Sequence, residues 1–321
     1  MEHVTAWVMG GSGMYRSFDE LLEAAQRLGL ARIAVVAGHD PDAIQALDAA
    51  RRTGLAEAVY VGDAEKVTAA AASAGVAIPL DAIVHEPDAE RVPGRAIALV
   101  REGKADLLMK GKISTAGLIR AVLDKDSGLR SGRLLSQVIA FSVPGQERLM
   151  LLTDAAINVA PSLQQKADIC RNAIEVAQAA LGIEHPNVAL LCAIEFVNPD
   201  MPATIDAAAL TQMNRRGQIS GAYLDGPIAL DAVLNKFAAE SKKLDSPLVE
   251  NTDILVAPDI EAANILYRAI LYFAKGESGG VVVGAKVPLI LLSRAETADT
   301  KLRSIAIAKL VAAATAARPD R

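Results

Sequence analysis

One stretch of the chain, KGKISTAGLIRAVL, combines cationic side chains with the start of a helix. Lys110 and Lys112 flank a glycine, and Ser114 and Thr115 open an amphipathic pattern that carries Arg120. A helix N-terminus presents unpaired N–H groups and a partial positive charge, so with neighbouring cations it can bind a phosphate or a carboxylate. The alternative is that Ser114 or Thr115 only caps the helix and that the lysines are solvated. The stretch alone supports both interpretations.

A second polar group lies in the segment TDAAINVAPS, which follows an apolar run. Asp154 and Asn158 stand there inside an otherwise apolar loop, where an unpaired carboxylate or amide would be unfavourable. Their side chains must therefore be hydrogen-bonded, either to the backbone or to a ligand and its supporting residues.

A third group lies in LLSRAETADTK, where Ser293 and Arg294 end an apolar strand and Glu296 and Asp299 follow. Acidic side chains in the first turn of a helix interact favourably with the helix dipole, which accounts for Glu296 and Asp299. The dipole does not account for Arg294. An arginine at a strand end beside a helix start is suited to planar recognition of phosphate.

Other kinds of site find little support in the residues. The segment GGSGMY near the N-terminus lacks the third glycine and the later acidic residue of a dinucleotide-binding loop, so we predict a variable or disordered N-terminus. The four histidines are scattered without metal-ligand spacing, and we expect no metal site. Cys170 and Cys192 stand in an apparent helix and an apparent strand of a chain without secretory features, which predicts free thiols in the core of a protein in a reducing compartment.

Short β-branched runs alternate with longer helical patterns along most of the chain. This alternation is typical of a parallel sheet covered by helices on both faces. Residues 134–153 interrupt it with two strand-like runs around a Pro-Gly turn, which predicts an antiparallel hairpin. We predict an α/β protein with one domain formed by residues 1–145 and 288–321 and a second domain formed by residues 146–287.

The three polar groups share a position relative to the predicted strands. In open α/β sheets, ligands bind beyond the carboxyl ends of the strands. Nearly all the polar exceptions of this chain follow predicted strands, in six segments: 110–115, 153–161, 195–204, 225–231, 258–264 and 293–301.

The composition restricts the class of partner. The chain has 321 residues, 52% of them hydrophobic, and a formal net charge of −5, without a basic run that would favour nucleic acid. It contains no uncharged apolar stretch long enough for a membrane span, and its start lacks the pattern of a signal peptide. We expect a cytoplasmic protein that binds neither nucleic acid nor membranes.

Together these stretches resemble the phosphate acyltransferases, and the likeness is closest to the phosphate butyryltransferase branch. The likeness covers nearly the whole chain from residue 16. It rests on SFDELLEAA, GKADLLMKGKISTAGLIRAVLDKDSGLRSGRLLSQV, LLTDAAINVAP, FVNPDMPATIDAAAL, RGQISGAYLDGPIALD, DILVAPDIEAANILYRAI and VVVGAKVPLILLSRAETADTKLRSIA.

The resemblance implies a fold like that of the isocitrate and isopropylmalate dehydrogenases. Such a fold has two α/β domains with mostly parallel sheets flanked by helices and a cleft between the domains, assembled as a homodimer or a larger homo-oligomer. It also implies an enzyme that transfers a short acyl group between coenzyme A and inorganic phosphate, giving an acyl phosphate and free CoA. Acyl-CoA and phosphate are then the partners, CoA is a substrate rather than a bound cofactor, and no metal is required.

The resemblance also implies roles for particular residues. In direct attack within a ternary complex, a carboxylate accepts the proton of the CoA thiol while arginines and N–H groups hold the phosphate. Arg120 matches the arginine that follows the family's Ser-Thr-Ala segment, and Ser293 and Arg294 match its Ser-Arg pair. Asp299 is the nearest match to the family's base, and Glu296 competes with it.

Departures from the acetyltransferase pattern bear on the substrate. Leu291 and Leu292 replace the usual Asn-Asp, which predicts room for a longer apolar acyl chain such as butyryl. Lys110 and Lys112 stand where acetyltransferases carry small residues, and we expect them to supply positive charge to the phosphate site. The other expected binding residues for phosphate or CoA, besides Arg120, are Ser114, Thr115, Asp154 and Asn158. The alternatives are a phosphate acetyltransferase and a non-catalytic CoA-binding paralogue.

Overall fold

The computed structural model describes residues 14–291 and 296–317, and the chain forms two compact units. Apart from the N-terminal residues, unit 1 comprises Phe18–Arg133 and the chain from Gly279 onwards, and unit 2 comprises Leu134–Ser278. The chain passes from unit 1 to unit 2 between residues 133 and 134 and returns between residues 278 and 279. The boundaries predicted from the sequence, after residues 145 and 287, both lie later in the chain. The first predicted boundary separated the two strands of the hairpin at 134–153, but both strands belong to unit 2.

The sheet of unit 1 is mostly parallel, and its strand order is β3-β2-β1-β4-β11-β10. Neighbouring strands from β3 to β11 run parallel, and β10 pairs antiparallel with β11. Apart from β10, which begins with Glu277 and Ser278, the strands are mostly apolar, as expected where both faces of a parallel sheet are covered. They are β1 (Ala31–Val36), β2 (Ala56–Gly62), β3 (Ile83–His85), β4 (Leu107–Lys110), β10 (Glu277–Val283) and β11 (Leu289–Ile290).

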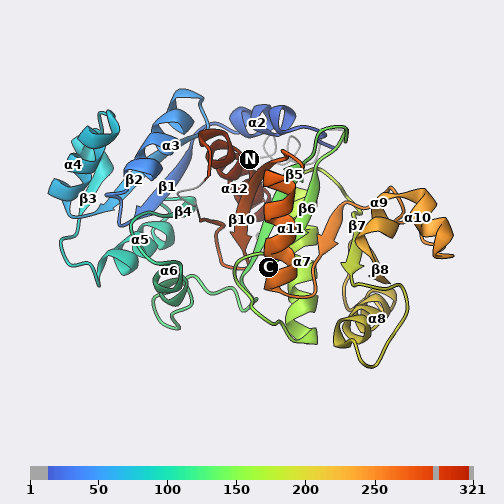
Figure 1. The fold of residues 1–321 in the computed structure, drawn as a ribbon. Coiled ribbons are helices and arrows are strands. Elements are labelled where there is room, and N and C mark those ends of the chain that lie inside the picture. Colours follow the sequence, from blue (N-terminus) through green and yellow to red (C-terminus); the bar gives the residue numbers. More distant parts are fainter. Residues whose placement is uncertain (1–13, 292–295, 318–321) are drawn as a thin grey trace. The chain divides into compact units, whose positions relative to one another are not determined.

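Helix α12 is the central helix of unit 1 and lies against α2 (Figure 1). Residues 304–311 of α12 are all buried, so the helix is enclosed rather than amphipathic. The helical elements of unit 1 are α2 (Phe18–Arg27), α3 (Pro41–Arg52), α4 (Ala64–Ala74), the 3-10 helix η1 (Leu80–Ala82), α5 (Val92–Arg101), α6 (Thr115–Val122) and α12 (Ala298–Ala316).

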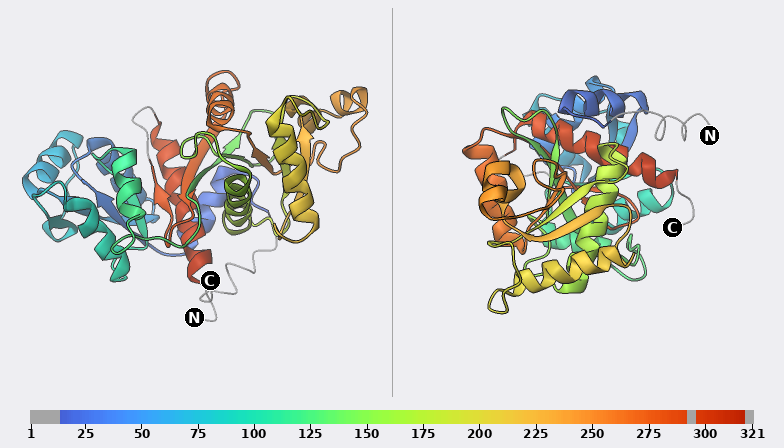
Figure 2. Two further views of the ribbon diagram at one scale, coloured as in Figure 1. Left: turned by 90° about the horizontal axis from the view of Figure 1, so that it is seen from below. Right: turned by 90° about the vertical axis from the view of Figure 1, so that its right-hand side faces the viewer.

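The sheet of unit 2 has the strand order β5-β6-β9-β7-β8. β5 and β6 form the predicted antiparallel hairpin, and β6, β9, β7 and β8 run parallel, which confirms the α/β class. Helices α7 and α11 cover opposite faces of this sheet (Figure 2). The elements are β5 (Ser136–Ser142), β6 (Met150–Thr153), α7 (Leu163–Ala180), β7 (Asn187–Leu191), α8 (Pro202–Arg215), β8 (Tyr223–Ile228), α9 (Leu230–Leu234), α10 (Lys236–Ser241), β9 (Ile254–Val256) and α11 (Ile260–Tyr272).

The two cysteines differ in their surroundings. Cys170 lies in α7 and is fully buried, as predicted, and burial raises the pKa of its thiol to about 12. Cys192 follows β7, is partly exposed, and has a pKa raised to about 11, again mainly by burial. Both thiols are therefore protonated near neutral pH and poor nucleophiles.

The prediction for residues 1–15 falls mostly outside the described residues. Across the part of the chain that the structure describes, every helix is too short or too polar to cross a membrane.

Candidate functional site

Three strands of unit 1 end at the same edge of its sheet, and two of the predicted polar groups follow them. β1 pairs in parallel with β4, so that Val36 lies opposite Lys110. β4 in turn pairs in parallel with β11, so that Met109 lies opposite Ile290. The segments that begin after β1, β4 and β11 therefore leave the sheet at one carboxyl edge, where ligands of open α/β sheets bind.

The loop between β4 and α6 places a helix start at this edge. Ser114 is the N-cap of α6, and its Oγ accepts a hydrogen bond from the backbone N–H of Gly117 at 3.0 Å. Leu118 and Val122 are buried and anchor the helix against the unit. Capping of α6 by Ser114 is thus confirmed, and the first turn of the helix, which follows the end of β4, carries the partial positive charge of a helix start.

Gly111 allows this loop to pass close to the end of β1. Its N–H donates to the carbonyl of Val36 at 2.9 Å, and the N–H of Lys112 donates to the carbonyl of Ala37 at 2.8 Å. A Cβ on Gly111 would lie 2.4 Å from the Ala37 oxygen and 2.7 Å from the Val36 oxygen. The sequence analysis gave this glycine no role, although a glycine directly after a buried strand is a signal for close backbone approach.

Gly111→Ala is expected to lower the free energy of unfolding by roughly 2–3 kcal/mol, because the added methyl group collides with two backbone oxygens that cannot move independently of β1. Urea unfolding would measure the loss. Gly94→Ala is the matched control: nothing lies within 4 Å of a Cβ there, and the residue is inside α5. That change should stabilise the protein by about 0.5 kcal/mol, and equal destabilisation of both variants would contradict the role given to Gly111.

The two lysines of the loop are placed differently. Lys110 Nζ donates to the carbonyl of Gly111 at 3.2 Å and to that of Ile113 at 3.3 Å, so its ammonium group lies over the turn that leads into α6. Lys112 is exposed. The contribution of both lysines to phosphate binding stays a prediction.

The pKa of His39, which follows β1, reflects the burial and the charges near this edge. Burial and then the charges of Lys66 and Lys112 lower its pKa, while Asp40 and Asp63 act in the opposite direction. Its Nδ1 is buried and has no hydrogen-bond partner in the described residues. The edge therefore holds an imidazole whose pKa is lowered by burial and by the charges of two lysines, a setting that favours an anionic ligand. From the sequence, His39 follows a strand and could face a cleft, but a solvated loop was the favoured interpretation, which its buried Nδ1 does not fit.

Arg120 lies in the last turn of α6 and is exposed. More than one helical turn separates it from Ser114, so only the length of its side chain could bring its guanidinium toward the first turn. Its assignment to phosphate stays a prediction.

The group after β11 is only partly described. Ser293 and Arg294 lie outside the described residues. Thr297 is the N-cap of α12, its Oγ1 accepting from the Thr300 N–H at 3.2 Å, and the exposed Asp299 is in the first turn. Glu296 is half-buried just before this cap. Both carboxylates thus stand at a helix start, as the dipole argument predicted.

Asp154 and Asn158 lie in unit 2, directly after β6. Asp154 Oδ1 accepts from the backbone N–H groups of Gln137, Ala156 and Ile157 at 3.1–3.2 Å. Its Oδ2 accepts from the Asn158 N–H at 3.0 Å and from Asn158 Nδ2 at 2.6 Å. Burial raises the pKa of Asp154, and these donors act in the opposite direction. The loop itself satisfies the carboxylate, and a direct contact of either residue with substrate stays a prediction.

The described residues contain no group of three or more His, Cys, Asp or Glu side chains arranged to hold a metal ion. The chemistry available at the carboxyl edge of unit 1 is instead that of an anion site: helix N–H groups, Lys110 and Lys112, with carboxylates at the start of α12.

A mostly parallel α/β sheet with a cationic helix start beyond its strand ends defines a class of anion-binding proteins, and comparison with known proteins identifies the family. A family described as "Phosphate acetyl/butaryl transferase" matches residues 89–309. The phosphate butyryltransferase of Clostridium beijerinckii is 41% identical over 300 residues, which cover 94% of this chain and 99% of that protein. The chain belongs to this family, and the resemblance stated from its motifs is confirmed.

Further comparisons bear on the substrate and the fold. The phosphate acetyltransferase of Thermotoga maritima is 44% identical over 217 residues, or 68% of this chain and 74% of that protein. The crystal structure of a branched-chain phosphotransacylase from Enterococcus faecalis has a TM-score of 0.75 and 31% identity, covering 88% of this chain and 99% of that one. A putative 4-hydroxythreonine-4-phosphate dehydrogenase from Salmonella typhimurium, at 14% identity and a TM-score of 0.52, shares the fold alone, over 88% of this chain and 99% of that one.

Proposed function

We propose that this protein transfers a short acyl group, butyryl by preference, between coenzyme A and inorganic phosphate. The observation that carries the proposal is the cationic start of α6 at the carboxyl edge of β4, beside the ends of β1 and β11. Membership of a family whose named relatives are phosphate acyltransferases supports it. We place the phosphate at this edge, held by the N–H groups of the first turn of α6, by Lys112 and by Arg120.

The proposed chemistry is direct transfer within a ternary complex. In the direction of acyl-CoA synthesis, the CoA sulfur attacks the carbonyl carbon of the acyl phosphate, the C–S bond forms, and the C–O bond to phosphate breaks. Asp299 or Glu296 accepts the thiol proton, and cations hold the charge that develops on the departing phosphate. Ser293 is proposed to orient the reacting groups and Arg294 to bind the anion. Asp154 and Asn158 are proposed to act through the loop that they hold.

The acyl chain length is the finer part of the proposal. Leu291 and Leu292 replace polar residues of the acetyltransferases and would surround a longer chain with apolar groups. Each methylene group that gains such contacts contributes about 0.8 kcal/mol, and butyryl has two more of them than acetyl. Butyryl should therefore be favoured over acetyl by roughly tenfold.

Thiol release from acetyl-, propionyl-, butyryl- and hexanoyl-CoA, with and without phosphate, tests both parts. We expect phosphate-dependent release with kcat/KM highest for butyryl-CoA. A maximum at acetyl-CoA would retain the mechanism and favour a phosphate acetyltransferase, the function named for the Thermotoga maritima relative. The absence of phosphate-dependent release with every acyl-CoA would favour a non-catalytic paralogue and contradict the proposal.

A further inference from the structure

Lys309 is a buried amine that the proposed function does not use. It lies in the enclosed part of α12 and is 4% exposed. Its Nζ donates to the carbonyl of Gly29, before β1, and to the carbonyl of Leu55, before β2, at 2.8 Å. Across the described residues, no carboxylate forms an ion pair with it. Burial lowers its pKa to about 8, so a sizeable fraction of the amine is neutral near physiological pH.

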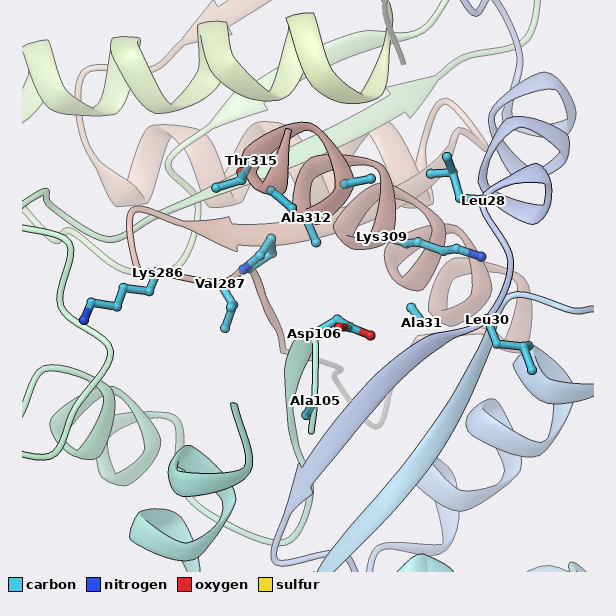
Figure 3. A pocket seen from close by; sticks show the side chains of 13 residues that line it. Leu28, Leu30, Ala31, Ala105, Asp106, Lys286, Val287, Lys309, Ala312 and Thr315 are labelled. Atoms are coloured by element: carbon cyan, nitrogen blue, oxygen red, sulfur yellow. The ribbon is translucent and has the colours of Figure 1, made fainter. Parts of the chain in front are cut away.

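This lysine lines a cavity of about 350 Å³ at the amino ends of the unit 1 strands (Figure 3). The edge is opposite to the one that carries the α6 start, since the cavity is bordered by Ala31 and Asp106, which begin or precede β1 and β4. Alanines of α12 and Leu28 and Leu30 form its apolar walls. A cavity of this volume is within the range of small-molecule sites.

The other charged groups at the cavity do not neutralise Lys309. Asp106 is engaged with Arg32, whose Nη2 lies 2.7 Å from Asp106 Oδ1. Lys286 borders the cavity and is exposed. The Lys286 side chain extends away from the other lining residues (Figure 3), so the cavity combines apolar walls with an amine without a counter-ion. This combination suits a small molecule that has a short apolar chain at one end and an anionic group at the other.

We propose that Lys309 is a site of self-acylation by a short-chain acyl phosphate bound in this cavity. The Nζ lone pair attacks the carbonyl carbon, the N–C bond forms, and the C–O bond to phosphate breaks. Inorganic phosphate leaves and takes up the proton lost by nitrogen, and an N-acyl-lysine remains. The proposal rests on the proposed function only for its source of acyl phosphate.

The hydrogen bonds of Lys309 suit this reaction. A neutral amine has two N–H bonds, which the carbonyls of Gly29 and Leu55 accept, and its lone pair remains available for attack. After acylation only one N–H remains, so one of the two carbonyls loses its donor. Acyl phosphate that accumulates would, by acylating Lys309, alter the contacts that hold α12, the helix whose first turn carries Asp299.

The test is acylation of the full-length protein by added butyryl phosphate without CoA, from pH 6.5 to 9.5, followed by site-resolved peptide mass spectrometry. We expect acylation of Lys309 with a rate that rises to half its maximum near pH 8. At that pH about half of the Lys309 amine is neutral, and its rate should exceed that of the exposed Lys286 roughly fivefold. Lys166 is the matched buried control, since its Nζ pairs with Asp206 at 2.8 Å, and it should stay unmodified.

Acylation confined to exposed lysines, or acylation of Lys309 only after the protein is unfolded by denaturant, would overturn the proposal. Equal rates at Lys309 and Lys166 would also overturn it, because the counter-ion would then make no difference. Since the butyryl phosphate is supplied, failure here is distinct from failure of the proposed function, which the thiol-release assay measures separately.

Discussion

Arg120→Ala is expected to lower kcat/KM for phosphate by roughly 100-fold. Removing one cation from a site that holds a developing phosphate charge has effects of this order, because the remaining donors cannot replace a bidentate guanidinium. The free energy of unfolding should change by less than about 0.5 kcal/mol, since Arg120 is exposed and the buried anchors of α6 are Leu118 and Val122. Phosphate-dependent thiol release and urea unfolding measure the two effects.

Two further variants make the result specific to phosphate binding. Arg120→Lys keeps the charge but not the planar pair of donors, so it should lose about tenfold and raise KM for phosphate. Arg52→Ala removes an exposed arginine of α3 that pairs with Asp48 at 3.1 Å, and it should leave the kinetics unchanged. Normal turnover by Arg120→Ala, or an equal loss in Arg52→Ala, would remove Arg120 from the proposed site.

The helices and strands that could be predicted are those marked by a pattern within a short stretch of the sequence. The buried strands of a parallel sheet are apolar runs, so β1, β2, β4 and β7 could be recognised from their composition. Ser162 and Gln165 have the spacing of a capping box, a local pattern that marks the start of α7, and both hydrogen bonds of the box are present. The short elements β3, α9 and α10 were missed, because three to six residues are too few for a periodic pattern.

Some contacts of the candidate site join residues close in the sequence, and others join segments far apart in the sequence. Capping by Ser114 is a contact over three residues and was predictable. The close approach of Gly111 to Val36 and the charge environment of His39 both depend on β1 and β4 being neighbours, although β2 and β3 lie between them in the chain. Only the strand order supplies that information, and a single sequence does not specify it.

Asp154→Ala is expected to lower the free energy of unfolding by at least about 3 kcal/mol. The carboxylate is 4% exposed and accepts from four backbone N–H groups as well as from Asn158 Nδ2. Alanine would leave these donors buried without an acceptor, and each unsatisfied donor costs about 1 kcal/mol or more unless water enters. Urea unfolding measures the loss, and thiol release on the folded fraction measures its effect on turnover.

Asp259→Ala is the control for this prediction, because Asp259 caps α11 by accepting one backbone N–H, from Ala262 at 2.8 Å. Its loss should cost about 1 kcal/mol. Asp154→Asn should fall between the two variants: an amide keeps an acceptor at the Oδ1 position but turns donors toward the N–H groups of Asn158. If Asp154→Ala were as stable as Asp259→Ala, the loop would not depend on the carboxylate, and a direct role of Asp154 in binding substrate would become the better explanation for a buried acid after β6.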